Sequence, residues 1–314
     1  MNDKQTKYPM VSVIMGVYNE APNMVRASIE SILKQTYTNL ELIIVIDNPD
    51  IQFLDAIIEE YAEKDKRIIV LYNEKNIGLA RSLNRGIDIA RGKYIARMDA
   101  DDISLNNRIE IEVSCLEENP DITLVYSGFI KIDMDGNKIS NTIVIPKNEK
   151  LLMQALEYNN IVVHPSVLMK TSAIKKVGGY NEFLASQDYD LWLRLKKRGY
   201  KFCCIKQPLI LYRVRDNSTT TKKVLDQYLS YRYAKYIYKN DKKFDRDQYI
   251  KYVEKKKKDQ KFVKHMETFT RSFQYNPLIK TIILLYYALI DYECRSHLLN
   301  FYKYKRCVKK INFE

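Results

Sequence analysis

Short apolar runs alternate with amphipathic stretches through the first hundred residues of the chain. The apolar runs are rich in Val, Ile and Leu, which is typical of strands buried on both faces of a parallel sheet. Between them, apolar residues recur at the three-to-four spacing of a helix. We therefore expect strands at 11–17, 40–46, 68–72 and 94–98, and helices at 24–34, 54–62 and 79–90. Such alternation predicts an α/β fold with a mainly parallel, doubly wound sheet.

The pattern becomes less regular after residue 105. Helical spacing predicts helices at 106–118, 151–158 and 190–197. Strands are expected at 122–132, 138–144, 202–205 and 209–214, and an extended segment at 161–169. The sequence Asp133-Met134-Asp135-Gly136 between the first two of these strands favours a tight hairpin turn.

The last 93 residues have a different pattern. Apolar side chains recur every fourth residue at Leu225, Leu229, Tyr233 and Ile237, and basic side chains follow a similar spacing on an adjacent face at Arg232, Lys235, Lys239 and Lys243. This predicts an amphipathic helix with a basic flank. A strongly apolar helix is expected at 278–290, but it is shorter than the roughly 20 residues of a membrane span.

Composition separates this tail from the rest of the chain. The net charge of the 314 residues is +13, yet residues 1–221 hold 29 Lys and Arg against 29 Asp and Glu, whereas residues 222–314 hold 23 against 10. All nine glycines precede residue 200, and 13 of the 25 tyrosines lie in the tail. We therefore predict two domains, 1–221 and 222–314, with their boundary near 216–224.

The charge of the tail fits three kinds of partner. An anionic membrane surface would attract the basic residues, with tyrosines at the interface. A nucleic acid would attract the same charges, but no recognised motif supports it, and we expect none to bind. The third interpretation is a helical appendage that packs on the first domain or on a second subunit and has a solvated basic face.

The cysteines and the N-terminus favour a cytoplasmic protein. The five cysteines are scattered and form no CxxC pair, as expected in a reducing compartment. The first residues are polar and do not resemble a signal peptide.

Polar and acidic turns follow three of the predicted strands. These turns are Gly16–Glu20, Asp47–Asp50 and Asp99–Asp102. Ligands of such sheets bind beyond the carboxyl ends of the strands, where the three turns should meet. The alternate carboxylates of Asp99 and Asp101 suit Mg²⁺ or Mn²⁺. Alone, this pattern is more often a solvated turn or a helix N-cap, but its place after a buried strand, with Asp47 at another strand end, favours a metal site.

In this order the segments resemble family 2 of the inverting, nucleotide-sugar-dependent glycosyltransferases, of the type that assembles bacterial cell-surface polysaccharides. The resemblance covers about residues 10–215 and rests on seven segments: 11–20, 41–47, 76–81, 98–102, 164–166, 177–180 and 186–194. It implies a GT-A fold, which is a Rossmann-like, mainly parallel sheet flanked by helices. The nucleotide-sugar half would span about 1–103 and the acceptor half about 104–221, followed by a C-terminal helical extension.

The resemblance also implies roles for individual residues. The nucleotide sugar would contact ten residues: Gly16, Val17, Tyr18, Glu20, Asp47, Gly78, Arg81, Asp99, Ala100 and Arg215. Asp99 and Asp101 would hold Mg²⁺ or Mn²⁺, and His164 and Trp192 would contact the acceptor. Three of these positions have an equally plain structural interpretation, because Arg81 suits a helix surface, His164 a satisfied structural histidine and Trp192 a core position.

Asp188 matches the general base of the family. Inversion needs a single in-line attack by an acceptor hydroxyl, and a carboxylate opposite the leaving diphosphate can take the proton of that hydroxyl. An acid at the start of helix 190–197 also stabilises the helix dipole, and both roles can hold at once.

Four positions depart from the family pattern: Gly16, Ile46, Gln187 and Arg215. Arg215 stands where a histidine is common, and an arginine cannot ligate a metal but can hold a diphosphate. We hypothesise that Arg215 supplies part of the leaving-group stabilisation.

The predicted function is transfer of a sugar from a UDP- or dTDP-sugar to a saccharide or lipid-linked saccharide acceptor, in capsule, O-antigen or exopolysaccharide assembly. The tail would hold the enzyme on the inner face of the plasma membrane or form a homodimer. The alternative is a non-catalytic module that binds a nucleotide sugar or a partner, as Ile46 and Arg215 suggest. A nucleotidyltransferase is disfavoured because no Gly-rich phosphate loop follows the first strand.

Overall fold

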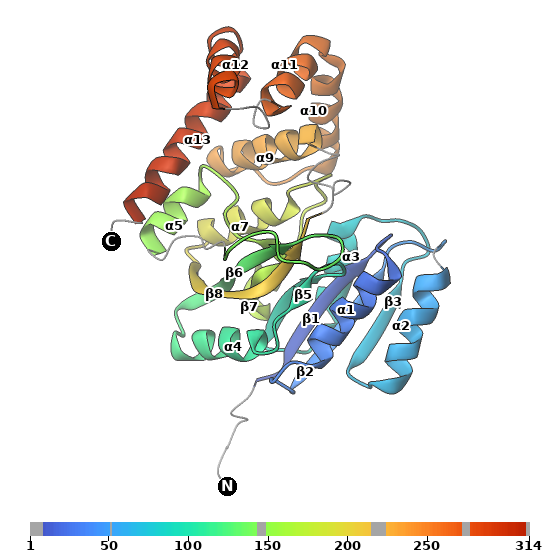
Figure 1. Cartoon of the computed structure of the whole chain (residues 1–314). Helices are drawn as coiled ribbons and strands as arrows, with labels where there is room; N and C mark the ends of the chain where they lie inside the picture. The colour runs from blue at the N-terminus through green and yellow to red at the C-terminus, as the bar shows by residue number, and fades with distance from the viewer. Residues whose placement is uncertain (1–8, 51, 143–148, 215–223, 272–276, 312–314) are drawn as a thin grey trace.

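The computed structural model describes residues 9–50, 52–142, 149–214, 224–271 and 277–311 (Figure 1). Its centre is an eight-stranded sheet with the order β3-β2-β1-β4-β7-β6-β8-β5. The first four strands are parallel to one another and lie where the apolar runs predict them: β1 (Val11–Val17), β2 (Leu40–Ile46), β3 (Ile68–Tyr72) and β4 (Tyr94–Asp99).

Helices cover both faces of these four strands. They are α1 (Pro22–Leu33), α2 (Gln52–Lys64), α3 (Leu79–Ile89) and α4 (Arg108–Glu118). Alternate residues of β2 belong to two hydrophobic clusters, with Ile43 and Val45 packed with α3, and Leu42 and Ile44 packed with α1, α2 and α4. Burial on both faces explains why β2 is almost continuously apolar.

The other half of the sheet is mixed. It contains β5 (Ile103–Ser104), β6 (Ile122–Ile132), β7 (Val167–Lys170) and β8 (Lys201–Arg213). Strand β7 is antiparallel to β4 and β6, whereas β8 is parallel to β6 and antiparallel to β5. The short helices of this half are α5 (Glu149–Leu156), the 3₁₀ turn His164–Ser166, α6 (Thr171–Lys176) and α7 (Gln187–Lys197).

Three sequence-based expectations for this half were wrong. The strand expected at 138–144 is, over its described residues, only an isolated bridge between Ile132 and Lys138. The ladder stops there because the hydroxyl of Ser140 accepts the hydrogen bond of the Lys131 N–H, at 2.9 Å. The segment expected to be extended from 161 to 169 contains the 3₁₀ turn, and β7 begins only at residue 167.

The third correction concerns β8. The sequence predicts two strands separated by Pro208, but the structure has one strand that runs past it. Pro208 lies opposite Gly128, between two register shifts. A proline needs no ladder hydrogen bond at such an irregularity, so it does not break the strand.

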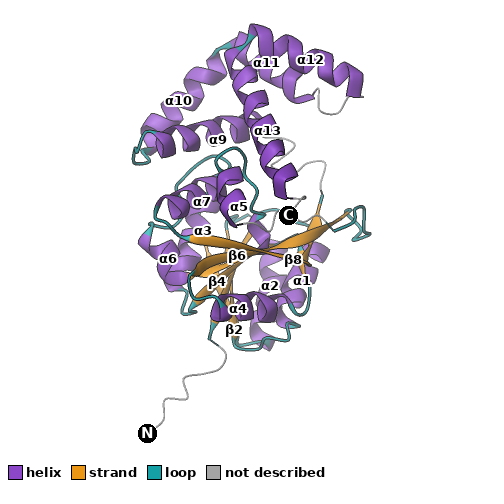
Figure 2. Cartoon of the chain, turned by 90° about the vertical axis from the view of Figure 1, so that its left-hand side faces the viewer, coloured by secondary structure: helices purple, strands orange, loops and turns teal. Residues whose placement is uncertain are grey.

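The tail forms five described helices above the α/β part. They are α9 (Val224–Lys239), α10 (Arg246–Lys258), α11 (Gln260–Arg271), α12 (Pro277–Ile290) and α13 (Tyr292–Ile311). Helix α9 lies against α7, and α13 returns toward α5 (Figures 1 and 2). The predicted apolar face of α9 is confirmed, since Leu229, Tyr233 and Ile237 are buried in the same cluster as residues of α7. The predicted domain boundary falls almost wholly outside the described residues.

Lys235 departs from the expected solvated basic flank. Its side chain is only 7% exposed, and its Nζ lies 5.1 Å from the centre of the Tyr231 ring. Burial, together with the charges of Lys239 and Arg232, lowers the pKa of Lys235 to about 7. Part of the basic flank is therefore interior. In the part of the chain that the structure describes, no helix is both long enough and apolar enough to cross a bilayer.

Candidate functional site

The carboxyl ends of β1, β2 and β4 meet at one edge of the sheet, as expected. Strand β1 lies in the middle, and its Gly16 is in register with Val45 of β2 and with Asp99 of β4. The backbone N–H of Asp47 donates a hydrogen bond of 2.8 Å to the carbonyl of Val17. The three polar turns therefore form one continuous surface.

The turn after β1 is held by its own side chains. Glu20 Oε2 accepts a hydrogen bond of 2.8 Å from the backbone N–H of Tyr18, and Asn48 Nδ2 donates one of 3.1 Å to the Tyr18 carbonyl. Val17 is buried, but the Tyr18 ring is 44% exposed. A β-carbon at Gly16 would lie 3.0 Å from Leu79 Cδ1, so a side chain there would press on the start of α3. An exposed ring on a fixed turn suits stacking with a planar group.

Asp47 holds the loop that leads into α3. Its Oδ1 accepts hydrogen bonds of 2.8 Å from Asn73 Nδ2 and from the Ile77 N–H, and its Oδ2 accepts one of 2.9 Å from the Gly78 N–H. Gly78 has φ of +86°, a left-handed conformation that glycine adopts without strain. A nucleobase would meet Asp47 only through the lone pairs that these bonds leave open.

The acidic turn after β4 contacts the buried side chain of Arg97. The guanidinium of Arg97 is buried and forms an ion pair with Asp99, whose side chain is 33% exposed. Ala100 is buried and closes the turn. The buried Asp102 accepts a hydrogen bond of 2.7 Å from the Arg213 N–H at Oδ1, while its Oδ2 has no hydrogen-bond partner among the described residues. Burial and the charges of Asp99 and Asp101 raise the pKa of Asp102 well above its ordinary value.

Arg213 fixes the position of this turn from β8. Its Nε donates a hydrogen bond of 2.8 Å to the Asp101 carbonyl, and its Nη1 donates to the carbonyls of Asp133 and Met134, both at 2.8 Å. The side chain therefore ties the acidic turn to the turn after β6.

The acidic turn fits a hard divalent cation. Three carboxylates fall within four residues, they repel one another, and one buried oxygen lacks a donor in the described structure. No group of three or more His, Cys, Asp or Glu side chains encloses a metal site in the described parts of the chain. Mg²⁺ takes one or two carboxylates and completes its shell with water and phosphate oxygens, so such a partial set of ligands is sufficient.

Asp188 lies in the first turn of α7. Ser186, two residues before Asp188, has φ of +55°. Asn160 Nδ2 donates a hydrogen bond of 2.7 Å to Asp188 Oδ2. Burial raises the pKa of Asp188, the Asn160 bond and backbone N–H groups oppose this shift, and the charge of Asp99 raises the pKa further. The two carboxylates are thus close enough to interact, which brings the predicted base and the acidic turn into one site.

His164 and Tyr180 contact each other near the proposed site. His164 Nε2 and the Tyr180 hydroxyl share a hydrogen bond of 2.7 Å. Burial, with a contribution from the charge of Arg97, lowers the pKa of His164 well below its ordinary value. Burial raises the pKa of Tyr180, and the charges of Asp188 and Asp99 act in the same direction. His164 therefore has a satisfied hydrogen bond, which fits the structural interpretation that the sequence left open.

Trp192 does not line the surface of the site. It is 0% exposed and packs edge-on against His164 and Phe202, with ring-centre distances of 6.0 and 6.4 Å. The Trp192 ring faces the core, so an acceptor cannot contact it as the sequence-based interpretation expected.

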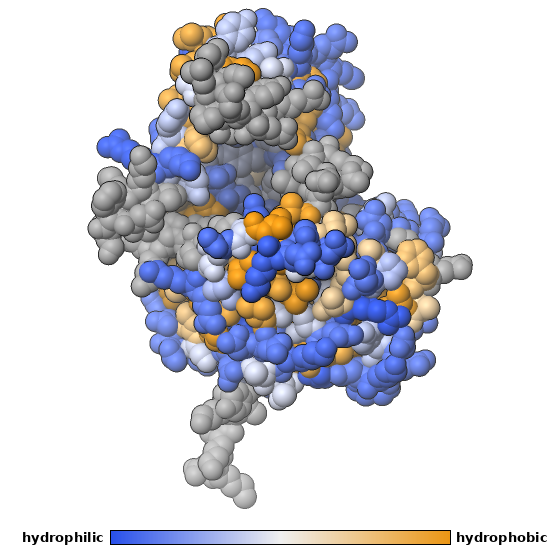
Figure 3. Space-filling model, viewed as in Figure 1, coloured by the Kyte–Doolittle hydropathy of each residue, from blue (hydrophilic) through white to orange (hydrophobic). Residues whose placement is uncertain are grey.

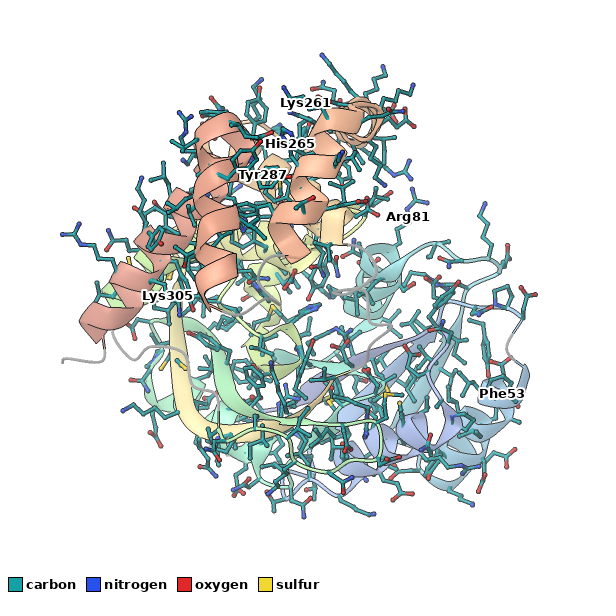
Figure 4. All side chains as sticks on the ribbon, turned by 45° about the horizontal axis from the view of Figure 1, so that its top comes forward. Phe53, Arg81, Lys261, His265, Tyr287 and Lys305 are labelled. Carbon is teal, nitrogen blue, oxygen red and sulfur yellow. The ribbon has the colours of Figure 1, made fainter. Side chains whose placement is uncertain are left out.

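Arg81 takes part in an ion-pair cluster between α3 and the tail. Arg81 pairs with Glu182 at 2.7 Å, and the same carboxylate binds Arg246 of α10 at 2.8 Å. Figure 4 shows Arg81 on the side of α3 that faces the tail. Arg215 lies outside the described residues.

The sequence missed several side chains of the site. Tyr212 is one, since its pKa is raised by burial and by the charges of Asp102, Asp99, Asp101 and Asp188. Tyr180 lies in the segment 177–180, and Tyr212 and Arg213 lie just before Arg215. Their positions in the sequence could therefore have identified them as candidate site residues. Arg97 directly precedes the segment 98–102. Asn160 belongs to none of the seven segments, and only the fold reveals it.

Comparisons with known proteins agree with this geometry. The family model of Glycosyl transferase family 2 matches residues 12–178. The chain is 39% identical to an uncharacterized glycosyltransferase, MJ1057, of Methanocaldococcus jannaschii over 77% of this chain and 84% of the relative. It is 31% identical to the amylovoran biosynthesis glycosyltransferase AmsE of Erwinia amylovora over 68% and 79% of the two chains. For the O-antigen biosynthesis glycosyltransferase WbnJ of Escherichia coli the identity is 34%, over 67% and 82%.

A solved structure supports the fold. The crystal structure of S. aureus TarS superposes with a TM-score of 0.56 at 18% identity, over 71% of this chain and 38% of that chain. The match spans well under half of TarS, and at this identity it concerns the fold alone. Together with the curled, mainly parallel sheet, it confirms the expected GT-A architecture with a C-terminal helical extension.

Proposed function

Since the chain belongs to glycosyl transferase family 2, we propose that it transfers a sugar from a UDP- or dTDP-sugar to an acceptor hydroxyl with inversion at the anomeric carbon. The observation that supports this most strongly is the closeness of Asp188 to the acidic turn, where the charge of Asp99 acts on the pKa of Asp188. A base beside a metal-diphosphate site is the arrangement that in-line displacement requires.

The nucleotide would bind along the edge formed by Gly16–Glu20, Asp47 and Gly78. The exposed Tyr18 ring offers a stacking surface for the base. Asp47 can accept the imide N–H of uracil or thymine with a remaining lone pair, which would favour these two bases. In this proposal Arg215 would supply positive charge to the diphosphate. Arg81 instead pairs with Glu182, and Ala100 is buried.

Asp99 and Asp101 would hold Mg²⁺ or Mn²⁺. The cation, when bound, neutralises negative charge that builds on the leaving diphosphate. Arg97 orients Asp99, because its buried guanidinium pairs with that carboxylate. Arg213 keeps Asp101 in place, because its Nε donates a hydrogen bond to the Asp101 carbonyl.

Asp188 would act as the general base. The acceptor oxygen attacks the anomeric carbon, the bond from that carbon to the diphosphate oxygen breaks with its electron pair on the diphosphate, and Asp188 takes the hydroxyl proton. The raised pKa makes the carboxylate a stronger base. In this proposal the acceptor hydroxyl approaches the carboxylate while Asn160 holds Oδ2.

The proposed acceptor is a saccharide or lipid-linked saccharide of a cell-surface polysaccharide. The printed names of two relatives, for amylovoran and O-antigen biosynthesis, support this class. For the whole protein we propose a cytoplasmic position with peripheral attachment to the inner face of the plasma membrane. Helix α12 supports the attachment, since its outer face exposes four large apolar side chains, Leu285, Tyr286, Leu289 and Ile290.

Figure 3 shows hydrophobic residues gathered over the part of the surface where Figure 1 draws α12. Leu289 is the most exposed of them, at 76%. Flotation with phosphatidylglycerol vesicles should bind the wild type, and L289E should bind less. Equal recovery of the two proteins, or binding that ignores anionic lipid, would contradict attachment through α12. A concentration-dependent dimer that L289E abolishes would instead assign this face to a second copy of the chain.

The proposed reaction is tested by a donor screen. The protein is incubated with a panel of UDP- and dTDP-sugars and Mn²⁺, and release of the nucleoside diphosphate is measured. With water as the acceptor, we expect release from one donor, and an NMR spectrum, recorded before the free sugar mutarotates, in which its anomeric configuration is opposite to that of the donor. A product with retained configuration would contradict the inverting mechanism. Binding of donor without any release would support the non-catalytic module instead.

A further inference from the structure

The loop that leads to Asp188 is held by the helical tail. The Leu184 N–H donates a hydrogen bond of 3.1 Å to the Tyr249 hydroxyl of α10, and Ser186 Oγ donates one of 3.5 Å to the Gln227 carbonyl of α9. Glu182, earlier in the same loop, pairs with Arg246 at 2.8 Å. Helix α9 lies alongside α7 in both ribbon views (Figures 1 and 2).

This loop has a conformation that needs support. Ser186 has φ of +55° and ψ of 28°, in the left-handed region that residues other than glycine adopt at a cost. It lies two residues before Asp188, so the direction of its backbone sets where the carboxylate points. The contacts from α9 and α10 favour this conformation over the alternatives that a serine would otherwise prefer.

Tyr231 of α9 touches both segments that form the Asn160–Asp188 pair. Its ring stacks on Tyr189, the neighbour of Asp188, with 4.9 Å between ring centres and 21° between planes. Its hydroxyl donates a hydrogen bond to the carbonyl of Tyr158, two residues before Asn160. One partly buried side chain of the tail thus bridges the two backbone segments whose side chains meet at the proposed base.

The bridge is rigid because its parts are mutually held. Tyr189 donates a hydrogen bond of 2.8 Å from its hydroxyl to the Leu156 carbonyl at the end of α5. Lys235 donates one of 3.1 Å to the Tyr231 hydroxyl. These contacts hold the Tyr231 side chain, which extends from α9, against α7 and the end of α5.

We propose that the helical tail is part of the catalytic apparatus and that Tyr231 is a positioning residue, which holds Asn160 against Asp188. The proposal rests on the proposed role of Asp188 as the general base. It gives the tail a task in the reaction itself, separate from attachment to a membrane.

The test compares Y231L with Y236F, a matched control on the same helix. Tyr236 is exposed and its hydroxyl accepts a hydrogen bond from Lys242, away from α7. The assay is release of nucleoside diphosphate from the UDP- or dTDP-sugar found in the donor screen, with Mn²⁺, as a function of pH. For Y231L we expect kcat to fall by about tenfold, with the donor KM unchanged, because small displacements of a catalytic group are costly.

The pH profile separates positioning from a general loss of structure. The Asn160 bond stabilises the charged form of Asp188, so its loosening raises the pKa of that carboxylate. The acid limb of the kcat profile should therefore move to higher pH in Y231L, and Y236F should keep the wild-type profile. The double variant N160A/Y231L should lose less than the product of the two single losses, because both act on one bond.

An unshifted acid limb in Y231L, or multiplicative losses in the double variant, would overturn the proposal. If Y231L fails to fold, as judged by far-UV circular dichroism, Y231F decides by the same profile, since it keeps the ring and loses only the hydroxyl that bonds to the Tyr158 carbonyl and to Lys235. An unshifted limb in Y231F would then overturn it. Wild-type activity in D188N would instead refute the proposed role of the base.

Discussion

Asn160 donates a hydrogen bond from Nδ2 to Asp188 Oδ2 across 2.7 Å, joining the loop after α5 to the first turn of α7. The Oδ1 atom of Asn160 is buried and has no hydrogen-bond partner among the described residues, so this bond is what fixes its side chain. A neutral donor on one oxygen stabilises the ionised carboxylate, and backbone N–H groups act in the same direction. The pair gives the proposed base both its orientation and part of its pKa.

Replacing Asn160 by alanine should move the pH profile of the enzyme. The bond from Asn160 lowers the pKa of Asp188, so its loss adds to the increase that burial already causes. The base works only when deprotonated, so the acid limb of kcat should shift to higher pH, and activity below that limb should fall. The measurement is nucleoside diphosphate release from pH 5 to pH 9. N159A changes the exposed neighbouring side chain and should leave the profile where it is.

Asp101→Asn should weaken metal activation. A neutral amide is a poorer ligand than a carboxylate for a hard cation. We expect the Mn²⁺ concentration for half-maximal donor turnover to rise by roughly tenfold or more, a loss of about 1.4 kcal/mol of metal binding. EDTA should abolish turnover of the wild type. The control is D135N, which changes an exposed acid of the turn after β6, and an equal metal requirement for D101N and D135N would exclude Asp101 as a ligand.

Trp192→Phe should affect stability and not acceptor binding. Its ring is wholly buried against His164 and Phe202, so the smaller ring leaves a cavity. We expect a loss of about 1–3 kcal/mol in the free energy of unfolding, measured with urea. The acceptor KM should stay at the wild-type value. A raised acceptor KM at unchanged stability would restore the acceptor contact that the sequence suggested.

Arg213→Met should destabilise the protein and slow turnover together. The guanidinium satisfies the carbonyls of Asp101, Asp133 and Met134, and its loss leaves buried acceptors without donors. We expect a loss of roughly 2–4 kcal/mol in stability. The Mn²⁺ requirement should rise as well, because the Asp101 turn loses its anchor. Full stability in R213M would show that the acidic turn does not depend on this side chain.

The first four strands could be predicted because the signal for each lies within its own short apolar run. Strands such as Leu40–Ile46 are buried on both faces, so the apolar run is itself the signal, and parallel topology then brings Asp47 and Asp99 to one edge. Pro208 misled the prediction because a proline usually ends a strand, and only the irregular pairing with β6 accommodates it.

The Asn160–Asp188 contact and the burial of Lys235 depend on tertiary packing, which the sequence pattern does not show. Asn160 and Asp188 are 28 residues apart and share no pattern, so their contact depends on how α5 packs beside α7. Lys235 follows the basic spacing of α9, but α9 lies in an interior interface, and helical periodicity cannot tell water from a neighbouring helix.

The central claim is that Asp188 is the general base, and the kcat of D188N tests it most directly. With the donor identified by the screen and Mn²⁺ present, D188N should release nucleoside diphosphate roughly 10²–10⁴-fold more slowly than the wild type. Its affinity for UDP or dTDP, measured by calorimetry, should be unchanged, because Asp188 contacts the acceptor and not the nucleotide. A D188N enzyme that turns over at the wild-type rate would contradict the account.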